Sequence, residues 1–318
     1  MGGTFNRDIF QDEAKARTWL ETELWPDGPV CPHCGVLHRA TRIQGETSRP
    51  GLYMCNECRK QFTVTVGTLY ERSHVPLNKW LFAVYLMMAS KKGVSAHQIH
   101  RMIGVSYKTA WFMCHRIREG LGDRAFPGPL GGRNKVVEAD ETYLGGKEAN
   151  KHNSKRSRPG GGAKGKEAVF ALVERNGKVR SRHLAEVNVK TLRAAIVTHV
   201  DRRSYLMTDE AGFYTWIGKE FSGHGTVNHS IEEYVRGGFW HTNTVEGYFA
   251  VLKRGLYGTY HHVSAAHLKR YLCEFDFRYN ERAALKVSDV ERFTKAMKRI
   301  VGKRLTYRRT GEATNTRT

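Results

Sequence analysis

The chain has 318 residues, with 52 Lys and Arg against 31 Asp and Glu, so its formal net charge is +21. This length allows two or three domains with buried cores, and the positive charge attracts polyanions, of which nucleic acid is the leading candidate. A membrane-surface protein is disfavoured because no apolar run approaches ~18 residues and no basic amphipathic helix stands alone. The N-terminus lacks the residue order of a signal peptide, so we expect a cytoplasmic protein.

A zinc ribbon is predicted after an N-terminal helix over residues 5–24. The pairs Cys31-Pro-His-Cys34 and Cys55-Asn-Glu-Cys58 are separated by 20 residues, which is typical of a four-cysteine zinc site. Four thiolates complete a tetrahedron and leave no open position for water, so the predicted single Zn²⁺ is structural. A pair of redox CxxC motifs is the alternative. The nearby histidines are not needed as ligands, and residues 61–66 are predicted to form the closing strand.

A helix, a short turn and a second helix are predicted after a first core helix that starts at Pro76. Ser95 caps the first of the two, Gly104 ends it, and a second serine caps the helix that runs to about Leu121. This is the helix-turn-helix layout, in which the start of the second helix enters the major groove of DNA. An ordinary helical hairpin is the alternative. The residues expected to reach DNA are Ser106, Tyr107, Lys108 and Thr109.

The rest of the chain has the pattern of an α/β domain. A strand reads VVEADETYLGG, and a Gly-, Lys- and Arg-rich loop suited to phosphate contact follows from Lys147 to Lys166. A hairpin turning at Asn176-Gly177, a helix over about 189–200 and a strand ending at Asp209 complete the pattern. The expected divisions are 1–75 (helix and zinc ribbon), 76–122 (helix-turn-helix), 123–134 (linker), 135–285 (α/β domain) and 286–318 (basic C-terminal segment).

The stretch HTNTVEGYFAVLKRG, residues 241–255, is predicted to form a helix that presents one carboxylate and one ammonium group on the same face. Glu246 and Lys253 are seven positions apart, which places them within roughly 20° of each other around a helix. The alternative is a capping box between Asn243 and Glu246, with Lys253 as a solvated cation.

Three acidic residues stand out as candidate metal ligands: Asp140 inside a strand, Asp209 at a strand end, and Glu246 on the helix. Carboxylates gathered together repel one another without a cation, and Mg²⁺ prefers such oxygen ligands. Two ions a few ångströms apart would suit phosphodiester chemistry. The rival carboxylates are Glu138, Glu141 and Glu210, although adjacent acids more often cap nearby backbone.

The order of these motifs resembles that of the zinc-ribbon transposases of bacterial insertion sequences, of the insertion sequence 1595 type. The resemblance rests on CPHC, CNEC, the helix-turn-helix, VVEADETYLGGKE, LMTDEAG and HTNTVEGYFAVLKRG, and covers about residues 10–285. It implies a ribonuclease H-like catalytic domain with a DDE-type triad of Asp140, Asp209 and Glu246. Lys253, with its neighbour Arg254, is implied to contact the DNA of the transposon end.

The resemblance implies a DNA transposase that binds terminal inverted repeats, cleaves the element ends and joins the 3'-hydroxyl to target DNA. Two Mg²⁺ or Mn²⁺ ions would be catalytic, and a homo-oligomer would act on double-stranded DNA in the bacterial nucleoid. Relatives can carry asparagine as the third ligand, so Asn243 is the alternative to Glu246. The functional alternatives are a non-catalytic zinc-ribbon and helix-turn-helix regulator, or a ribonuclease H-like nuclease without strand transfer.

Overall fold

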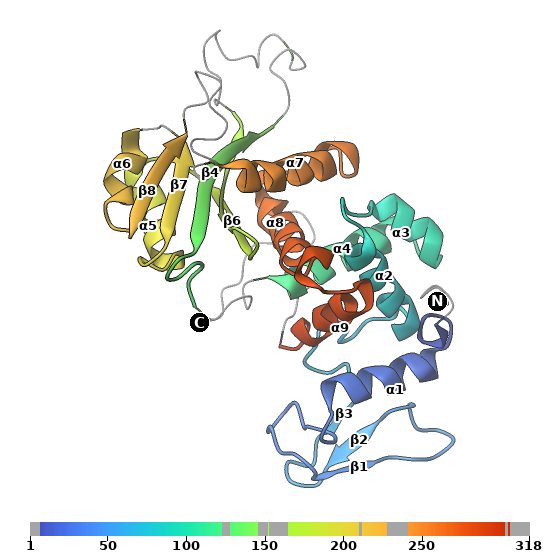
Figure 1. The fold of residues 1–318 in the computed structure, drawn as a ribbon. Coiled ribbons are helices and arrows are strands. Elements are labelled where there is room, and N and C mark those ends of the chain that lie inside the picture. Colours follow the sequence, from blue (N-terminus) through green and yellow to red (C-terminus); the bar gives the residue numbers. More distant parts are fainter. Residues whose placement is uncertain are drawn as a thin grey trace. The chain divides into compact units, whose positions relative to one another are not determined.

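The computed structural model describes residues 7–122, 128–145, 152, 165–209, 212–227, 241–302 and 305 (Figure 1). The chain divides into two compact units. The first comprises 1–90, 94–122 and 289–318, and the second comprises 91–93 and 123–288. The predicted loop from Lys147 to Lys166 lies outside the described residues except for three of its positions, as does Glu210. No helix in the described part of the chain is long and apolar enough to cross a membrane.

The N-terminal part of the first unit contains helix α1 (Glu13–Leu24) and a three-stranded antiparallel ribbon. The Asp12 side chain starts α1 by accepting the N–H of Lys15 at 2.9 Å, so a separate 3-10 turn, Asp8–Phe10, precedes it. The strand predicted over 61–66 stops at Phe62, because the backbone then turns through hydrogen bonds such as Val66 N to Thr63 O at 3.0 Å. The ribbon strands are β1 (Ala40–Arg42), β2 (Tyr53–Cys55) and β3 (Gln61–Phe62).

Three further helices of this unit are α2 (Leu77–Ala89), α3 (Ala96–Ile103) and α4 (Tyr107–Leu121). The predicted caps are confirmed: Ser95 Oγ accepts the N–H of Gln98, and Ser106 Oγ accepts the N–H of Thr109, both at 3.1 Å. Gly104 ends α3 with a φ of 64°, a left-handed conformation that glycine adopts without strain. Two helices joined by a three-residue turn are therefore present, and their role in DNA binding stays a prediction.

Helix α9 (Asp289–Arg299), which was not predicted from the sequence, completes the first unit. The Phe293 ring stacks on Trp19 with centroids 5.0 Å apart and meets the edge of Phe10 at 5.9 Å. After the helix, Gly302 N donates to the carbonyl of Gly67 at 2.7 Å. Residues more than 200 positions apart along the chain thus share one core.

The second unit is built on a five-stranded sheet in the order β6-β5-β4-β7-β8 (Figure 1). Strands β4, β5 and β6 are antiparallel, whereas β7 and β8 run parallel to β4. Helices α5 and α6 cover one face, and α7 and α8 cover the other. This is the arrangement expected of a ribonuclease H-like domain. The bounds are β4 (Val136–Leu144), β5 (Glu167–Glu174), β6 (Val179–Leu184), α5 (Val189–His199), β7 (Tyr205–Asp209), α6 (Gly212–Gly218), β8 (Gly223–Val227), α7 (Asn243–Gly258) and α8 (Ala265–Asn280).

A half-buried carboxylate joins three of these elements and makes the stability of the second unit depend on pH. Asp276 of α8 accepts the hydroxyl of Tyr248 at 2.6 Å, and both the N–H and the hydroxyl of Ser181 at 2.8 Å. Burial raises the pKa of Asp276 to about 7, although the hydrogen bonds from Tyr248 and Ser181 oppose the shift. The folded protein therefore holds this proton at pH values where the unfolded chain has lost it.

We expect the contribution of Asp276 to be fully present below about pH 4 and to be lost as the pH rises through about 7. The free energy of unfolding, measured by urea titration in a series of buffers, should fall over this window, with each pKa unit worth ~1.4 kcal/mol at most. Asp276→Asn cannot titrate, so its curve should be flatter than that of the wild type. Parallel curves for the two proteins would contradict the assignment.

Candidate metal centres and catalytic site

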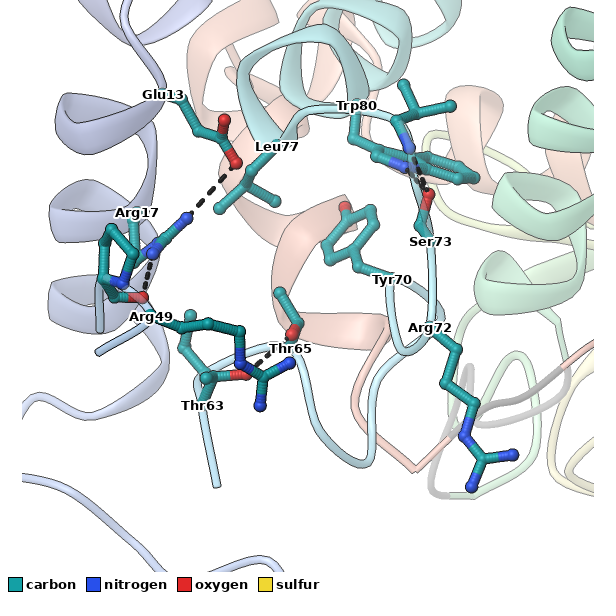
Figure 2. Close-up of a pocket in the computed structure, with 13 residues that line it drawn as sticks. Glu13, Arg17, Arg49, Thr63, Thr65, Tyr70, Arg72, Ser73, Leu77 and Trp80 are labelled. Atoms are coloured by element: carbon teal, nitrogen blue, oxygen red, sulfur yellow. Dashed lines mark hydrogen bonds and ion pairs between the residues drawn. The ribbon is translucent and has the colours of Figure 1, made fainter. Parts of the chain in front are cut away.

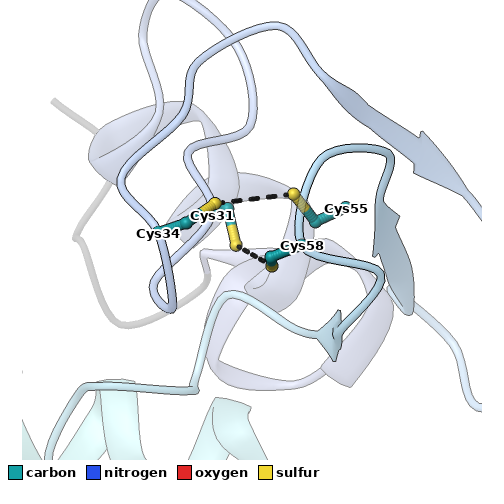
Figure 3. Close-up of side chains that lie close together, drawn as sticks. All are labelled: Cys31, Cys34, Cys55 and Cys58. Atoms are coloured by element: carbon teal, nitrogen blue, oxygen red, sulfur yellow. Dashed lines mark hydrogen bonds between the residues drawn. The ribbon is translucent and has the colours of Figure 1, made fainter.

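The four predicted zinc ligands come together in the ribbon (Figure 3). The Sγ atoms of Cys31 and Cys58 are 3.7 Å apart, as are those of Cys34 and Cys55, and all four lie within 4.8 Å of one another. Sulfur atoms at ~2.3 Å from a tetrahedral zinc ion would be about 3.8 Å apart. The spacing therefore fits one Zn²⁺. The Nε2 atom of His33 instead approaches the carbonyl of Gln61 at 3.3 Å, outside this group.

The chemistry of the thiols also fits a cation. N–H groups of Cys58 and Glu57 lower the pKa of Cys55 to about 7, although burial opposes them. The N–H of Val36 favours the thiolate of Cys34, but burial and hydrogen bonds to the other three sulfurs together raise its pKa to about 12. The Cys34 thiol therefore keeps its proton beside the Cys55 thiolate near neutral pH unless a cation compensates the negative charge.

Asp140 and Asp209 occupy neighbouring positions in the sheet of the second unit. Strand β4 pairs in parallel with β7, with Glu138 opposite Met207. Each aspartate lies two residues further along its strand, so the continued register brings the two side by side on the same face. That face is the one covered by α7, the helix that carries Glu246.

The electrostatics of Asp140 link it to the two other acids. Burial raises its pKa to about 7. The N–H of Glu141, which donates to Asp140 Oδ1 at 2.7 Å, opposes the shift, while the negative charges of Glu141, Asp209 and Glu246 add to it. The three predicted ligands are thus close enough to act on one another. Their ligand atoms are less tightly gathered than the thiols, which are the one such compact group among the described residues.

Two of the rival carboxylates of β4 are used in holding helices. Glu141 points to the opposite face of the sheet and accepts the hydroxyl of Tyr214 in α6. Glu138 is fully buried and accepts the N–H groups of Thr244 and Val245 at 2.8 and 2.9 Å. Of the acids on β4, Asp140 is therefore the one that is not used to hold a helix and that faces the proposed metal site beneath α7.

The start of α7 differs from the prediction. Asn243 is the first residue inside the helix and is exposed, so its predicted role as N-cap is wrong. Thr242 occupies the cap position without a capping hydrogen bond from its side chain, and donates its hydroxyl to Glu246 Oε1 at 3.0 Å. The first turn of α7 is instead capped by the carboxylate of Glu138, which lies far away in the sequence on strand β4. No local sequence pattern reveals such a cap. Lys253 is half-buried two turns later, and Arg254 beside it is exposed.

The four predicted DNA-contact residues of the first unit fall into two pairs. Ser106 and Thr109 bond to each other, with their hydroxyl oxygens 2.8 Å apart. Tyr107 is 44% exposed and stacks on His97 with ring centroids 4.1 Å apart, and Lys108 is also exposed. Tyr107 and Lys108 are therefore the pair best placed to reach a ligand.

A pocket in the same unit lies between α1, the end of the ribbon and the start of α2 (Figure 2). Arg17 at its wall is paired with Glu13 at 3.2 Å, and the Ser73 hydroxyl accepts the indole N–H of Trp80 at 2.8 Å. These four polar side chains are thus paired within the pocket. None of the predicted zinc, DNA-contact or catalytic residues lines it.

Comparison with known proteins agrees with this architecture and defines the class of protein. The model of the ISXO2-like transposase domain matches residues 129–280, and that of the transposase zinc-ribbon domain matches residues 11–61. A protein in transposable element ISH50 of Halobacterium salinarum is 30% identical over 289 residues, covering 85% of this chain and 91% of that protein. The chain therefore belongs to the zinc-ribbon transposases of the insertion sequence 1595 type.

A solved structure, the cryo-EM structure of the simian T-cell lymphotropic virus intasome in complex with PP2A regulatory subunit B56 gamma, is also similar. The match covers 75% of this chain and 78% of that chain, with 11% identity and a TM-score of 0.32. At that score the similarity carries no further argument.

Proposed function

We propose that this transposase binds the terminal inverted repeats of its element, cleaves the element ends and joins the freed 3'-hydroxyl to target DNA. The observation that supports this most is the parallel pairing of β4 and β7, because it makes Asp140 and Asp209 neighbours on the face beneath α7. The proposed third acid, Glu246, adds to the negative potential that raises the pKa of Asp140. A homo-oligomer acting on double-stranded DNA in the cytoplasm is part of this proposal.

The donor set fits divalent cations, since the three side chains offer carboxylate oxygens in a partly buried site with excess negative charge. Asp140, Asp209 and Glu246 would hold two Mg²⁺ or Mn²⁺ ions, which when bound activate the attacking oxygen and stabilise the leaving one. Lys253 shares the helix face of Glu246 and would hold a substrate phosphate as a compact charge. Arg254 would add a backbone contact to the DNA.

Two in-line displacements at phosphorus account for the reaction. Water first attacks the phosphodiester at the element end, a P–O bond breaks, and a 3'-hydroxyl is freed. That hydroxyl then attacks a phosphodiester of the target DNA, which releases the target strand's own 3'-oxygen as the leaving group. No covalent bond to the protein forms in either step.

The test uses the full chain with Mg²⁺ and a duplex carrying the inverted repeat that flanks the gene. The wild type should nick the repeat and join its 3'-end to a second duplex, whereas Asp140→Asn and Asp209→Asn should bind the repeat without either product. Nicking without joining would identify a simple nuclease. Binding without nicking by the wild type would identify a DNA-binding regulator.

A second expectation concerns the helix-turn-helix. Changing Lys108 to Ala should weaken binding to the terminal repeat and reduce the salt dependence, because each phosphate that the protein no longer neutralises removes about 0.9 from the slope of log K against log salt. Changing Tyr107 to Ala removes the exposed ring and should reduce the preference for the repeat over random DNA. Gel-shift titrations at several salt concentrations measure both effects. An unchanged affinity and preference in the double variant would rule out α4 as the recognition helix.

A further inference from the structure

The carboxylate of Glu138 accepts four hydrogen bonds within the second unit. Its Oε1 accepts the Arg175 guanidinium at 2.6 Å and the Thr244 hydroxyl at 2.8 Å. Its Oε2 accepts the N–H groups of Thr244 and Val245 at 2.8 and 2.9 Å. Both oxygens are therefore occupied, and the side chain has no exposed surface. A metal ion could bind Glu138 only after these bonds had broken.

The arginine that compensates this charge also fixes the entrance to α7. Arg175 follows strand β5, and its own N–H donates to the carbonyl of Val136 at 3.0 Å. Its guanidinium bridges Glu138 and the carbonyl of His241 at 2.7 Å, just before the helix begins. A buried carboxylate needs a positively charged partner such as Arg175. The positive end of the α7 dipole stabilises the negative charge of Glu138 further. Strand β4, the end of β5 and the first turn of α7 are thus tied to one group.

The position of this group in the chain connects it to the proposed catalytic acids. Glu138 precedes Asp140 by two residues on the same face of β4. On the helix, Val245 immediately precedes Glu246. No loop intervenes between the hydrogen-bonded groups and either acid, so a shift of α7 along or about its axis would move Glu246 relative to Asp140.

We propose that Glu138 is the positioning residue for the third acid: by capping α7 from strand β4, it sets Glu246 against Asp140 for divalent-metal binding. This inference rests on the proposed function of the acidic site. Metal-binding carboxylates depend on such supporting hydrogen bonds, whose loss typically costs about 10- to 100-fold in metal affinity or activity. Glu138 itself touches neither metal nor DNA.

The experiment compares Mn²⁺ binding and amide hydrogen exchange in the full, zinc-loaded chain. Glu138→Gln should weaken Mn²⁺ binding by about 10- to 100-fold, speed exchange at the N–H groups of Thr244 and Val245, and leave repeat binding unchanged. The matched control is Glu174→Gln, which removes the same charge from a carboxylate held by Lys135 Nζ at 2.6 Å and Gly131 N at 3.0 Å. The control should retain the Mn²⁺ affinity of the wild type.

Should Glu138→Gln fail to fold, Thr244→Val removes one bond to the carboxylate and keeps the ion pair with Arg175. It should shift Mn²⁺ affinity in the same direction by less, and Thr244→Ser, which keeps the hydroxyl, should restore it.

Faster exchange at the first turn with unchanged Mn²⁺ affinity would overturn the inference, because the cap would then serve only stability. An equal loss of affinity in Glu174→Gln would overturn it as well. A failure of the proposed function gives a different result: Asp140→Asn would bind Mn²⁺ as tightly as the wild type, which would remove the acidic site itself.

Discussion

Glu246→Gln is expected to reduce Mg²⁺-dependent cleavage of the terminal repeat to below about a hundredth of the wild-type rate. The amide would hold the metal ions more weakly, and losing one source of transition-state stabilisation typically costs about 10²- to 10³-fold in rate. Three ionised carboxylates have a total charge of −3, which faces +4 on two divalent ions. With an amide at position 246, the total ligand charge is only −2, so the ions are bound more weakly. Gln has nearly the shape of Glu and can still accept the hydroxyl of Thr242, so the helix should fold. Single-turnover cleavage, with repeat binding as the control, measures the effect.

Asn243 provides the matched comparison three residues away. It is exposed and does not cap α7, so Asn243→Ala should leave both the free energy of unfolding and the cleavage rate close to those of the wild type. The reverse pattern, with Glu246→Gln active and Asn243→Ala folded but inactive, would assign the third ligand to Asn243.

Lys253→Met should weaken cleavage more than metal binding, because its proposed role is to hold a phosphate.

Zinc removal is expected to have the largest effect on stability. Structural zinc sites contribute apparent binding free energies of about 10–16 kcal/mol at pH 7, and much of this is folding free energy. Cys55→Ser removes a fully buried ligand that also packs with Tyr53 and Phe62 in the small core of the ribbon. We expect the variant to lose its one zinc ion per chain, and the ribbon to become accessible to protease between β1 and β3.

Cys273→Ser is the control, since this half-buried cysteine lies on α8 in the other unit. It should retain one zinc ion, as measured by elemental analysis of the dialysed protein. A Cys55→Ser protein, or a chelator-treated wild type, whose ribbon still resists protease would show that the metal is unnecessary for folding. The second unit should remain folded in both variants.

The features that the sequence predicted well are those encoded by neighbouring residues. Two Cys-x2-Cys turns determine the zinc ligands locally, and Ser95 and Ser106 cap helices through the third residue after each. The position of Asp209 at a strand end follows from the apolar run before it. These patterns depend on no distant contacts, so the sequence alone is enough to predict them.

The cap of α7 could not be predicted, because Glu138 and Thr244 are 106 positions apart. The sequence offered Asn243 as a nearer capping residue, and tertiary structure supplied a better one. Helix α9 was missed for a different reason: its basic composition hid the apolar spacing of Phe293, Met297 and Ile300 at i, i+4 and i+7. That spacing is the signal that could have revealed it.

Because α9 packs in the first unit, the two units can finish folding at different times during synthesis. The first unit needs residues from both ends of the chain, whereas residues 123–288 contain the sheet and helices of the second unit. During synthesis the second unit can fold as soon as α8 leaves the ribosome, while the core around Phe10 and Trp19 still lacks Phe293. We therefore expect nascent chains released before residue 289 to fold the second unit and to leave the core of the first unit incomplete. The recognition of an element end that we propose for the first unit would thus be acquired last.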